Sequence, residues 1–158
     1  TMKENFATRR HYLNQRSCMM VMLENGVLPI VNENDTVSVT ELMFTDNDEL
    51  SGLIARLMQC QALIILSNID GLYDGNPSDK DSNIIHEVSY GQDIAHYIRS
   101  ERSSAGRGGM QSKCTTATDV AAAGIHVFIA NGKRESILTD LLSSNTNVPY
   151  THFMPHDI

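Results

Sequence analysis

The chain has 158 residues, of which 41% are hydrophobic and 20% charged, proportions typical of a soluble globular protein. This length fits one domain with a sizeable core, which we expect to span 1–158. A net charge of −7 disfavours sequence-independent nucleic-acid binding, and no apolar run approaches the ~20 residues that a membrane helix needs. Because the N-terminus also lacks a signal-peptide pattern, we expect a cytoplasmic protein with neither nucleic-acid nor membrane partners.

The first third of the chain predicts two helices with a short strand between them. Residues 6–25 are rich in helix formers, and Gly26 is a natural stop signal. The apolar run 27–31 is typical of a strand buried on both faces. Residues 36–44 alternate loosely, as in a small hairpin, and a second helix is predicted over 48–59.

The remaining two thirds alternate strands and helices. Strands are predicted over 62–66, 125–130 and, as an edge strand, 149–154. Turn signals predict a loop at 67–77, and helices are predicted over 90–101, 110–123 and 134–142. Because parallel strands need crossovers of a dozen residues or more, this alternation predicts an α/β fold with a mostly parallel sheet sandwiched between helices.

Two clusters of acidic and amide side chains flank these elements. The first, Asn32–Asp35, directly follows the apolar run, and the second, Asp46–Asp48, directly precedes the second helix. Open α/β sheets place ligand sites at the carboxyl ends of their strands, where the first cluster falls. These side chains are suited to bind a substrate ammonium group, bind Mg²⁺ or orient lysines. The alternative is that they form only a turn and a helix cap.

A glycine-rich segment, 106–113, lies directly before a predicted helix. Glycines let backbone N–H groups converge on phosphate oxygens, and a helix N-terminus adds partial positive charge, so Lys113 is placed to reach a phosphate. The segment is not a GxxxxGK[ST] loop, and it is not a dinucleotide fingerprint because no strand directly precedes it. The alternative is a surface loop with a solvated lysine.

Cysteine and histidine spacing predicts no metal site. Cys18, Cys60 and Cys114 show no CxxC pattern and are expected to be reduced thiols. The six histidines show no metal-ligand spacing, so we expect them to be surface or packing residues.

Five segments together resemble the glutamate 5-kinases, a family within the amino acid kinase superfamily. They occur in the family's order and at its usual separations, at 27–37, 45–51, 71–73, 108–113 and 122–125. The resemblance runs from about Arg9 to Leu142. The pairing of Asn-Glu-Asn-Asp with Asp-Asn-Asp distinguishes this family from acetylglutamate, aspartate and uridylate kinases, which share the fold.

The resemblance implies a role for each matching residue. Asp48 matches the aspartate that orients the catalytic lysines, and Lys113 matches the lysine that neutralises the transferring phosphoryl group. The glutamate-binding positions match Asn32, Asp35 and Asn47. The nucleotide-binding positions match Ser67, Asn68, Arg107, Gly108, Gly109, Met110, Gln111, Ser112 and Lys113. The family usually has Thr-Asp at the Ser67-Asn68 position, and often a threonine in place of Arg107.

The implied activity is ATP-dependent phosphorylation of the L-glutamate side chain to glutamyl 5-phosphate, the first step of proline biosynthesis. Mg²⁺, a homo-oligomer and feedback inhibition by proline are also implied. The family's first strand and its Lys-x-Gly-(Thr/Ser)-Ser loop have no counterpart, so the chain looks like the C-terminal portion of a kinase domain, inactive alone. The alternatives are a non-catalytic remnant that binds a ligand or a partner chain, and a sister amino acid kinase.

Overall fold

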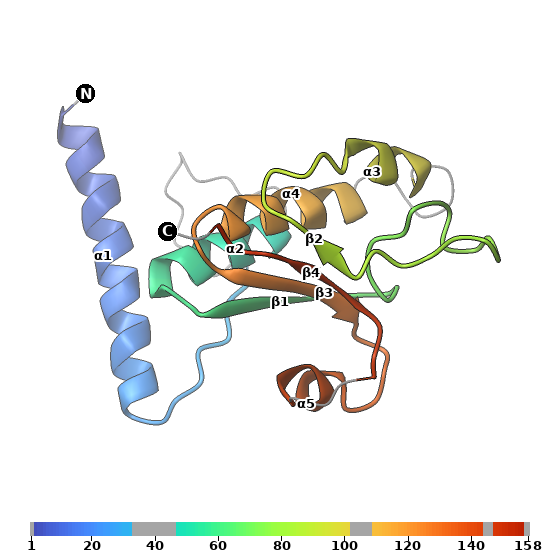
Figure 1. Cartoon of the computed structure of the whole chain (residues 1–158). Helices are drawn as coiled ribbons and strands as arrows, with labels where there is room; N and C mark the ends of the chain where they lie inside the picture. The colour runs from blue at the N-terminus through green and yellow to red at the C-terminus, as the bar shows by residue number, and fades with distance from the viewer. Residues whose placement is uncertain (1, 33–46, 102–108, 144–146, 157–158) are drawn as a thin grey trace. The chain divides into compact units, whose positions relative to one another are not determined.

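The computed structural model describes residues 2–32, 47–101, 109–143 and 147–156 (Figure 1). These residues fall into two compact units, Thr1–Cys60 and Gln61–Ile158. The prediction of one domain over 1–158 stays a prediction.

The first unit contains two helices, α1 (Met2–Glu24) and α2 (Asn47–Met58), where the sequence predicts them. Gly26 ends α1 with a φ of 72°, and the N–H of Val27 donates to Met22 O at 2.8 Å to close the last turn. Arg16 Nε on α1 donates to Leu57 O at 3.1 Å near the end of α2. This hydrogen bond satisfies one of the carbonyls that a helix leaves without a partner at its C-terminus.

The predicted strand at 27–31 is wrong. Residues 27–32 form no strand, and Leu28 and Ile30 are 77% and 91% exposed. A strand needs a neighbour for its backbone hydrogen bonds, and this segment pairs with none of the described strands. The apolar composition was therefore a poor guide to its structure. The hairpin predicted over 36–44 lies outside the described residues.

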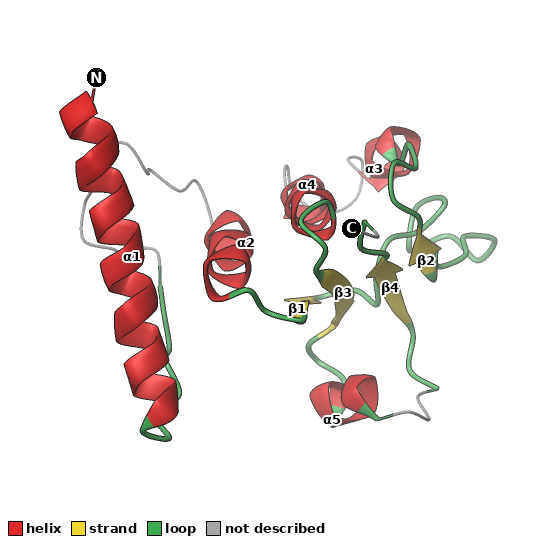
Figure 2. Cartoon of the chain, turned by 60° about the vertical axis from the view of Figure 1, so that its left-hand side comes forward, coloured by secondary structure: helices red, strands yellow, loops and turns green. Residues whose placement is uncertain are grey.

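The second unit is built on one mixed, mostly parallel sheet with the strand order β1-β3-β4-β2 (Figure 2). Its strands are β1 (Ala62–Ser67), β2 (Glu87–Val88), β3 (His126–Asn131) and β4 (Tyr150–Phe153). β1 pairs with β3 and β2 with β4 in parallel, while β3 and β4 are antiparallel. The predicted strands 62–66, 125–130 and 149–154 are confirmed, but β4 is an inner strand because the two-residue strand β2, which was not predicted, pairs with its outer side.

Helices cover both faces of the sheet, as the sequence predicts (Figure 2). α3 (Ala95–Glu101) and α4 (Gly109–Ala121) lie on one side, and α5 (Ile137–Leu142) lies on the other. α3 begins later than predicted because Gly91 adopts a φ of 77° and Asp93 Oδ1 accepts from the N–H of Ala95 at 2.9 Å, which caps the helix. α5 begins later because Ser136 is left-handed, with a φ of 59°.

In the second unit, buried side chains fill the space between the sheet and α4. The register places Val127 opposite Phe153 and Ile129 opposite Thr151, and all four side chains are buried. Alternation along the strands puts Phe128 and His152 on the other face. On α4 the core side chains are Cys114, Thr116, Ala117, Val120 and Ala121, all buried. This packing fixes the direction of α4 against β3.

Candidate functional site

The carboxyl edge of the parallel strands β1 and β3 gathers the candidate residues of the second unit. Ser67 ends β1, Asn68 follows it, and the register pairs Ser67 with Asn131 at the end of β3. The short connection 122–125 joins α4 to β3, so the helix runs back along the strand and its first turn lies at this same edge (Figure 1). The structure therefore brings Ser67 and Asn68 to the edge where α4 begins.

The first turn of α4 contains the described part of the glycine-rich segment. α4 begins at Gly109 and includes Met110, Gln111, Ser112 and Lys113. Lys113 is half-buried, and the next residue, Cys114, is fully buried. Because the first turn of a helix carries a partial positive charge, this turn and the lysine together favour an anionic ligand. Arg107 and Gly108 lie outside the described residues.

The turn at Ser67 is held against the loop that follows β3. The N–H of Gly132 donates to Ser67 O at 2.9 Å. A Cβ at Gly132 would lie 3.1 Å from the Leu66 Cβ, so the loop approaches β1 as closely as a glycine allows. Ser67 Oγ lies 3.4 Å from Asn68 Oδ1, which makes this a long hydrogen bond.

Asp70 forms an ion pair with Arg134 at this edge, which was not predicted from the sequence. Arg134 Nε donates to Asp70 Oδ1 and Arg134 Nη2 donates to Asp70 Oδ2, both at 2.8 Å. Asn131 Nδ2 donates to Asp70 Oδ1 at 3.1 Å. The hydrogen bonds from Arg134, followed by the one from Asn131, hold the pKa of Asp70 below its usual 3.8, although burial opposes them. In the sequence, Asp70-Gly71 and Asn131-Gly132 carry only turn signals.

The candidate residues of the first unit lie at its loop and at the start of α2. Asn32 is exposed at the end of the segment 27–32, and Asn47 is exposed at the start of α2. Asp48 is half-buried in the first turn of α2, where a carboxylate complements the helix dipole. Ser51 Oγ donates to Asp48 O at 2.7 Å and stabilises this turn. Asp35 lies outside the described residues.

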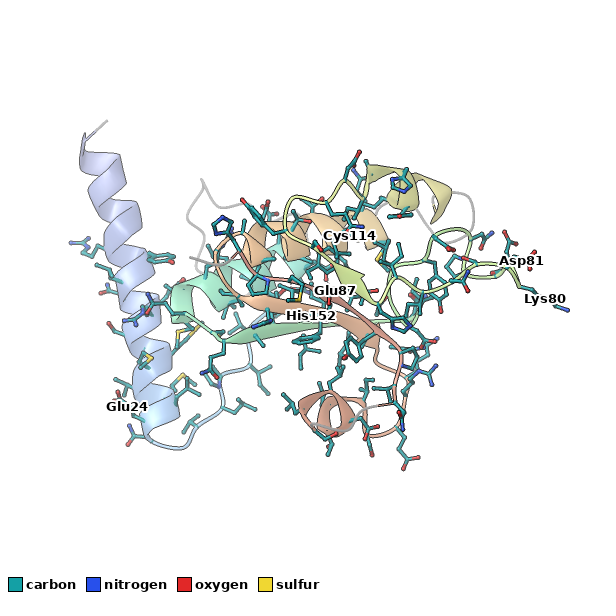
Figure 3. All side chains as sticks on the ribbon, in the orientation of Figure 1. Glu24, Lys80, Asp81, Glu87, Cys114 and His152 are labelled. Carbon is teal, nitrogen blue, oxygen red and sulfur yellow. The ribbon has the colours of Figure 1, made fainter. Side chains whose placement is uncertain are left out.

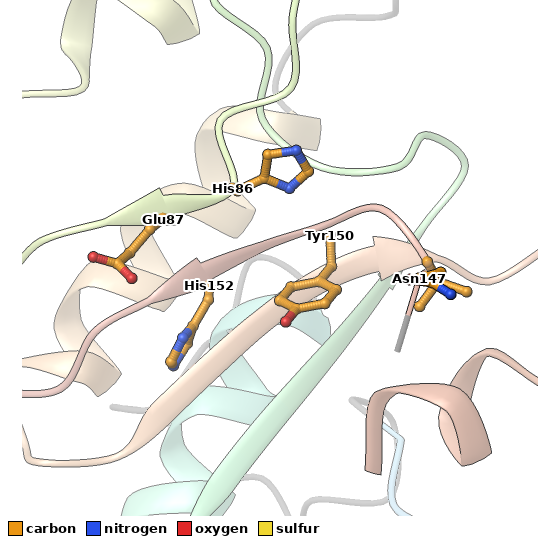
Figure 4. Close-up of a pocket in the computed structure, with 6 residues that line it drawn as sticks. His86, Glu87, Asn147, Tyr150 and His152 are labelled. Atoms are coloured by element: carbon orange, nitrogen blue, oxygen red, sulfur yellow. The ribbon is translucent and has the colours of Figure 1, made fainter. Parts of the chain in front are cut away.

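The sheet face opposite α4 carries an open pocket of about 400 Å³ (Figure 4). Its lining residues are His86, Glu87, Asn147, Val148, Tyr150 and His152. Beside it, the His152 and Phe128 rings stack with centroids 4.4 Å apart. Burial lowers the pKa of His152 below its usual 6.5, and the nearby His126 lowers it further by charge repulsion, while the Glu87 carboxylate acts in the opposite direction. The sequence predicted these histidines to be packing or surface residues, and His152 does pack in this face.

Two further features bear on the kind of protein. In the part of the chain that the structure describes, no three histidine, cysteine, aspartate or glutamate side chains are grouped to hold a metal ion. No described helix is both long enough and apolar enough to cross a membrane.

Curated relatives match this chain over nearly its whole length. The chain is 64% identical to "Glutamate 5-kinase" of Bacteroides thetaiotaomicron over 98% of its residues and 43% of the relative's. It is 51% identical to "Glutamate 5-kinase" of Chlorobaculum tepidum over 86% of its residues and 37% of the relative's. The chain therefore spans about two fifths of the length of these relatives.

Solved structures share the fold at low sequence identity. A carbamate kinase from Giardia lamblia bound to AMP-PNP matches 90% of this chain and 50% of its own, with a TM-score of 0.59 and 18% identity. A UMP kinase from Ureaplasma parvum matches 88% of this chain and 52% of its own, with a TM-score of 0.57 and 14% identity. These likenesses concern the fold alone.

A family model settles the classification. The model described as "Amino acid kinase family" matches residues 2–131, which is most of the chain. The match includes both helices of the first unit and the parallel strands β1 and β3 of the second. By this match, and by its curated relatives and α/β fold, the chain belongs to the amino acid kinase family.

Proposed function

We propose that this chain is part of a glutamate 5-kinase, which transfers the γ-phosphoryl group of ATP to the side-chain carboxylate of L-glutamate. The observation that carries the proposal is the 64% identity to a curated glutamate 5-kinase over 98% of the chain. The carboxyl edge of β1 and β3 supports it, because the first turn of α4 there favours an anionic ligand. In this proposal, 1–158 forms part of one kinase domain.

The chemistry requires charge neutralisation more than proton transfer. A glutamate side chain has a pKa of about 4.3, so its carboxylate is already ionised at neutral pH and needs no general base. The difficulty is the approach of this anion to a polyphosphate, and phosphoryl transfer is catalysed by positioning and electrostatic stabilisation. We assign Lys113 and the first turn of α4 to the transferring phosphoryl group.

The remaining residues divide between the two substrates. Asn32, Asp35 and Asn47 are proposed to bind glutamate, and Asp48 to orient the lysines. The nucleotide is proposed to contact Ser67, Asn68 and the segment from Arg107 to Lys113. The Ser67 hydroxyl, the Asn68 amide and the start of α4 lie at one edge of the sheet, which fits a nucleotide bound there.

Mg²⁺ is proposed to enter with ATP. Magnesium in kinases is held largely by phosphate oxygens, with one or two carboxylates and water. We propose that Asp48, in the first turn of α2, orients the metal-bound phosphates. When bound, the ion would neutralise phosphate charge during transfer.

The wider biology of the proposal follows from the family resemblance. We propose a cytoplasmic enzyme of proline biosynthesis that forms a homo-oligomer and is inhibited by proline. The second candidate, carried over from the sequence analysis, is that these residues bind a ligand or a partner chain without transferring phosphate.

The test is ATP turnover by the complete gene product with L-glutamate as the acceptor. ADP release and trapping of the acyl phosphate with hydroxylamine would both depend on glutamate. N-acetylglutamate, aspartate, carbamate and UMP serve as competing acceptors. Turnover with another acceptor alone would contradict the glutamate assignment, and nucleotide binding without any turnover would favour the second candidate.

A further inference from the structure

Asp70 and Arg134 join the loops that follow the two parallel strands. The guanidinium group makes two parallel hydrogen bonds to the carboxylate, each 2.8 Å long, and this bidentate arrangement fixes the direction of both side chains. Asp70 lies three residues after Ser67 along the chain. A shift of the Ser67-Asn68 turn would therefore strain the ion pair.

The loop after β3 is itself well fixed. Asn131 Nδ2 donates to Asp70, while Asn131 Oδ1 accepts from the N–H of Lys133 at 3.0 Å. The N–H of Arg134 donates to Asn131 O at 3.2 Å, which closes the turn. With the bond from the Gly132 N–H to Ser67 O, the β3 loop holds the β1 loop both at its start and at Asp70.

Exposure helps to decide what this network does. The side chains of Arg134 and Asp70 are 42% and 19% exposed. Ion pairs this open to water contribute little to stability, because solvent screens them and ordering the side chains costs entropy. A bidentate pair in such a place is better suited to orient a neighbouring segment than to hold the fold together.

We propose that Asp70 and Arg134 are positioning residues for the nucleotide, whose ion pair holds the Ser67-Asn68 turn in the orientation that binds ATP. This inference rests on the proposed function, because it assumes that ATP binds at this edge. Neither residue needs to touch the nucleotide. Small displacements of positioning groups can cost up to about a hundredfold in rate, so a loosened turn should be measurable.

The first experiment measures ATP binding by calorimetry on the complete gene product. We expect Asp70→Asn and Arg134→Gln each to weaken ATP binding about tenfold, within the range that displaced groups produce. The KM for glutamate should change less than about twofold, because the change is confined to the nucleotide side. Arg134→Lys keeps the charge but loses the bidentate geometry, so it should also weaken ATP binding.

Matched controls separate this effect from a general change in charge. Lys133→Gln removes the same charge as Arg134→Gln from the neighbouring exposed position. Asp81→Asn removes the same charge as Asp70→Asn from the tip of the loop between β1 and β2, where Figure 3 shows Lys80 and Asp81 projecting. Both controls should bind ATP as the unmodified protein does.

A double variant and a melting curve provide the decisive readouts. If the two residues act through one another, Asp70→Asn with Arg134→Gln should weaken ATP binding no more than either change alone. Independent, additive losses would overturn the inference, as would lowered melting temperatures with unchanged ATP affinity. If Asp70→Asn does not fold, Arg134→Lys carries the same comparison. An unmodified protein that binds no ATP would overturn the proposed function and this inference together, whereas normal binding in every variant would overturn only the inference.

Discussion

His126 Nδ1 lies 2.9 Å from His152 Nε2, across the sheet face opposite α4. One ring must donate the hydrogen and the other must accept it, so the contact requires at least one neutral imidazole. The groups around His152 are His126, Tyr150, Glu87 and His86, contributed by β3, β4, β2 and the residue before β2. Protonation of both histidines would break the bond and place two positive charges side by side.

This contact predicts stability that falls in mild acid. The pKa of His152 is lowered in the folded protein, so below its unfolded value of 6.5 the unfolded state binds more protons. The free energy of unfolding should therefore rise with pH through this window and level off above it. Urea titrations between about pH 5 and 7.5 would measure the free energy of unfolding at each pH. His152→Gln should flatten the slope and His96→Gln, on α3, should not; parallel slopes in all three proteins would contradict the prediction.

Lys113→Ala should reduce turnover far more than substrate binding. Removing one group that stabilises transition-state charge typically costs about 10²–10³ in kcat. Steady-state kinetics of the complete gene product, with glutamate and ATP varied in turn, would measure kcat and both KM values. Lys80→Ala, in the exposed loop between β1 and β2, is the matched control. Near-normal turnover in Lys113→Ala would remove Lys113 from the proposed site.

Asp35→Ala should act mainly on glutamate. Loss of a charged hydrogen-bond acceptor costs about 1.5–3 kcal/mol, or roughly 10- to 100-fold in the KM for glutamate, with a smaller effect on the KM for ATP. The same kinetic assay distinguishes the two substrates. Asp81→Ala provides the control for a lost surface carboxylate. An unchanged KM for glutamate would count against the assignment.

Gly71→Ala should destabilise the second unit. A Cβ there would lie 3.0 Å from the backbone N of Thr151 and would collide with Thr151 Oγ1, which accepts from the N–H of Leu72 at 2.8 Å. Because Thr151 is fully buried, the overlap cannot be relieved toward solvent, and overpacking of this kind costs about 1–3 kcal/mol.

Chemical denaturation would measure the change at Gly71. Gly109→Ala is the matched comparison, because a Cβ at Gly109 meets no atom of the described residues within 4 Å. The free energy of unfolding of the Gly109→Ala variant should not fall. Equal stability of Gly71→Ala and the unmodified chain would show that β4 can retreat from the loop.

Short sequence patterns predicted the helices and strands whose formation depends mainly on neighbouring residues. The helices α1, α2 and α4 were predicted from composition and stop signals, and β1 and β3 from compact apolar runs. The same reasoning failed at 27–31, because an apolar run becomes a strand only when another strand pairs with it. The inner position of β4 could not be predicted from the sequence either, because the order of strands along the chain does not determine their order in the sheet.

The candidate site likewise contains residues that local patterns predicted and residues that they did not. The glycine-rich segment and Lys113 were predicted to lie at a helix start, and the described part does. Asp70 and Arg134 are 64 residues apart, and a turn signal at each gives no indication that they meet. Their partnership depends on the parallel pairing of β1 and β3, which brings the two following loops to one edge.

The position of β4 also affects how the protein can be made. Residues 150–153 complete the sheet by pairing with both β3 and β2. During synthesis from the N-terminus, β2 emerges from the ribosome more than 60 residues before β4. This separation follows from the pairing of Glu87 with His152 in the parallel β2–β4 pair. Until then β3 and β2 each lack the strand between them. This sheet can therefore be completed only after residues 150–153 have been made, and until then the open edges of β2 and β3 are available to pair with other chains.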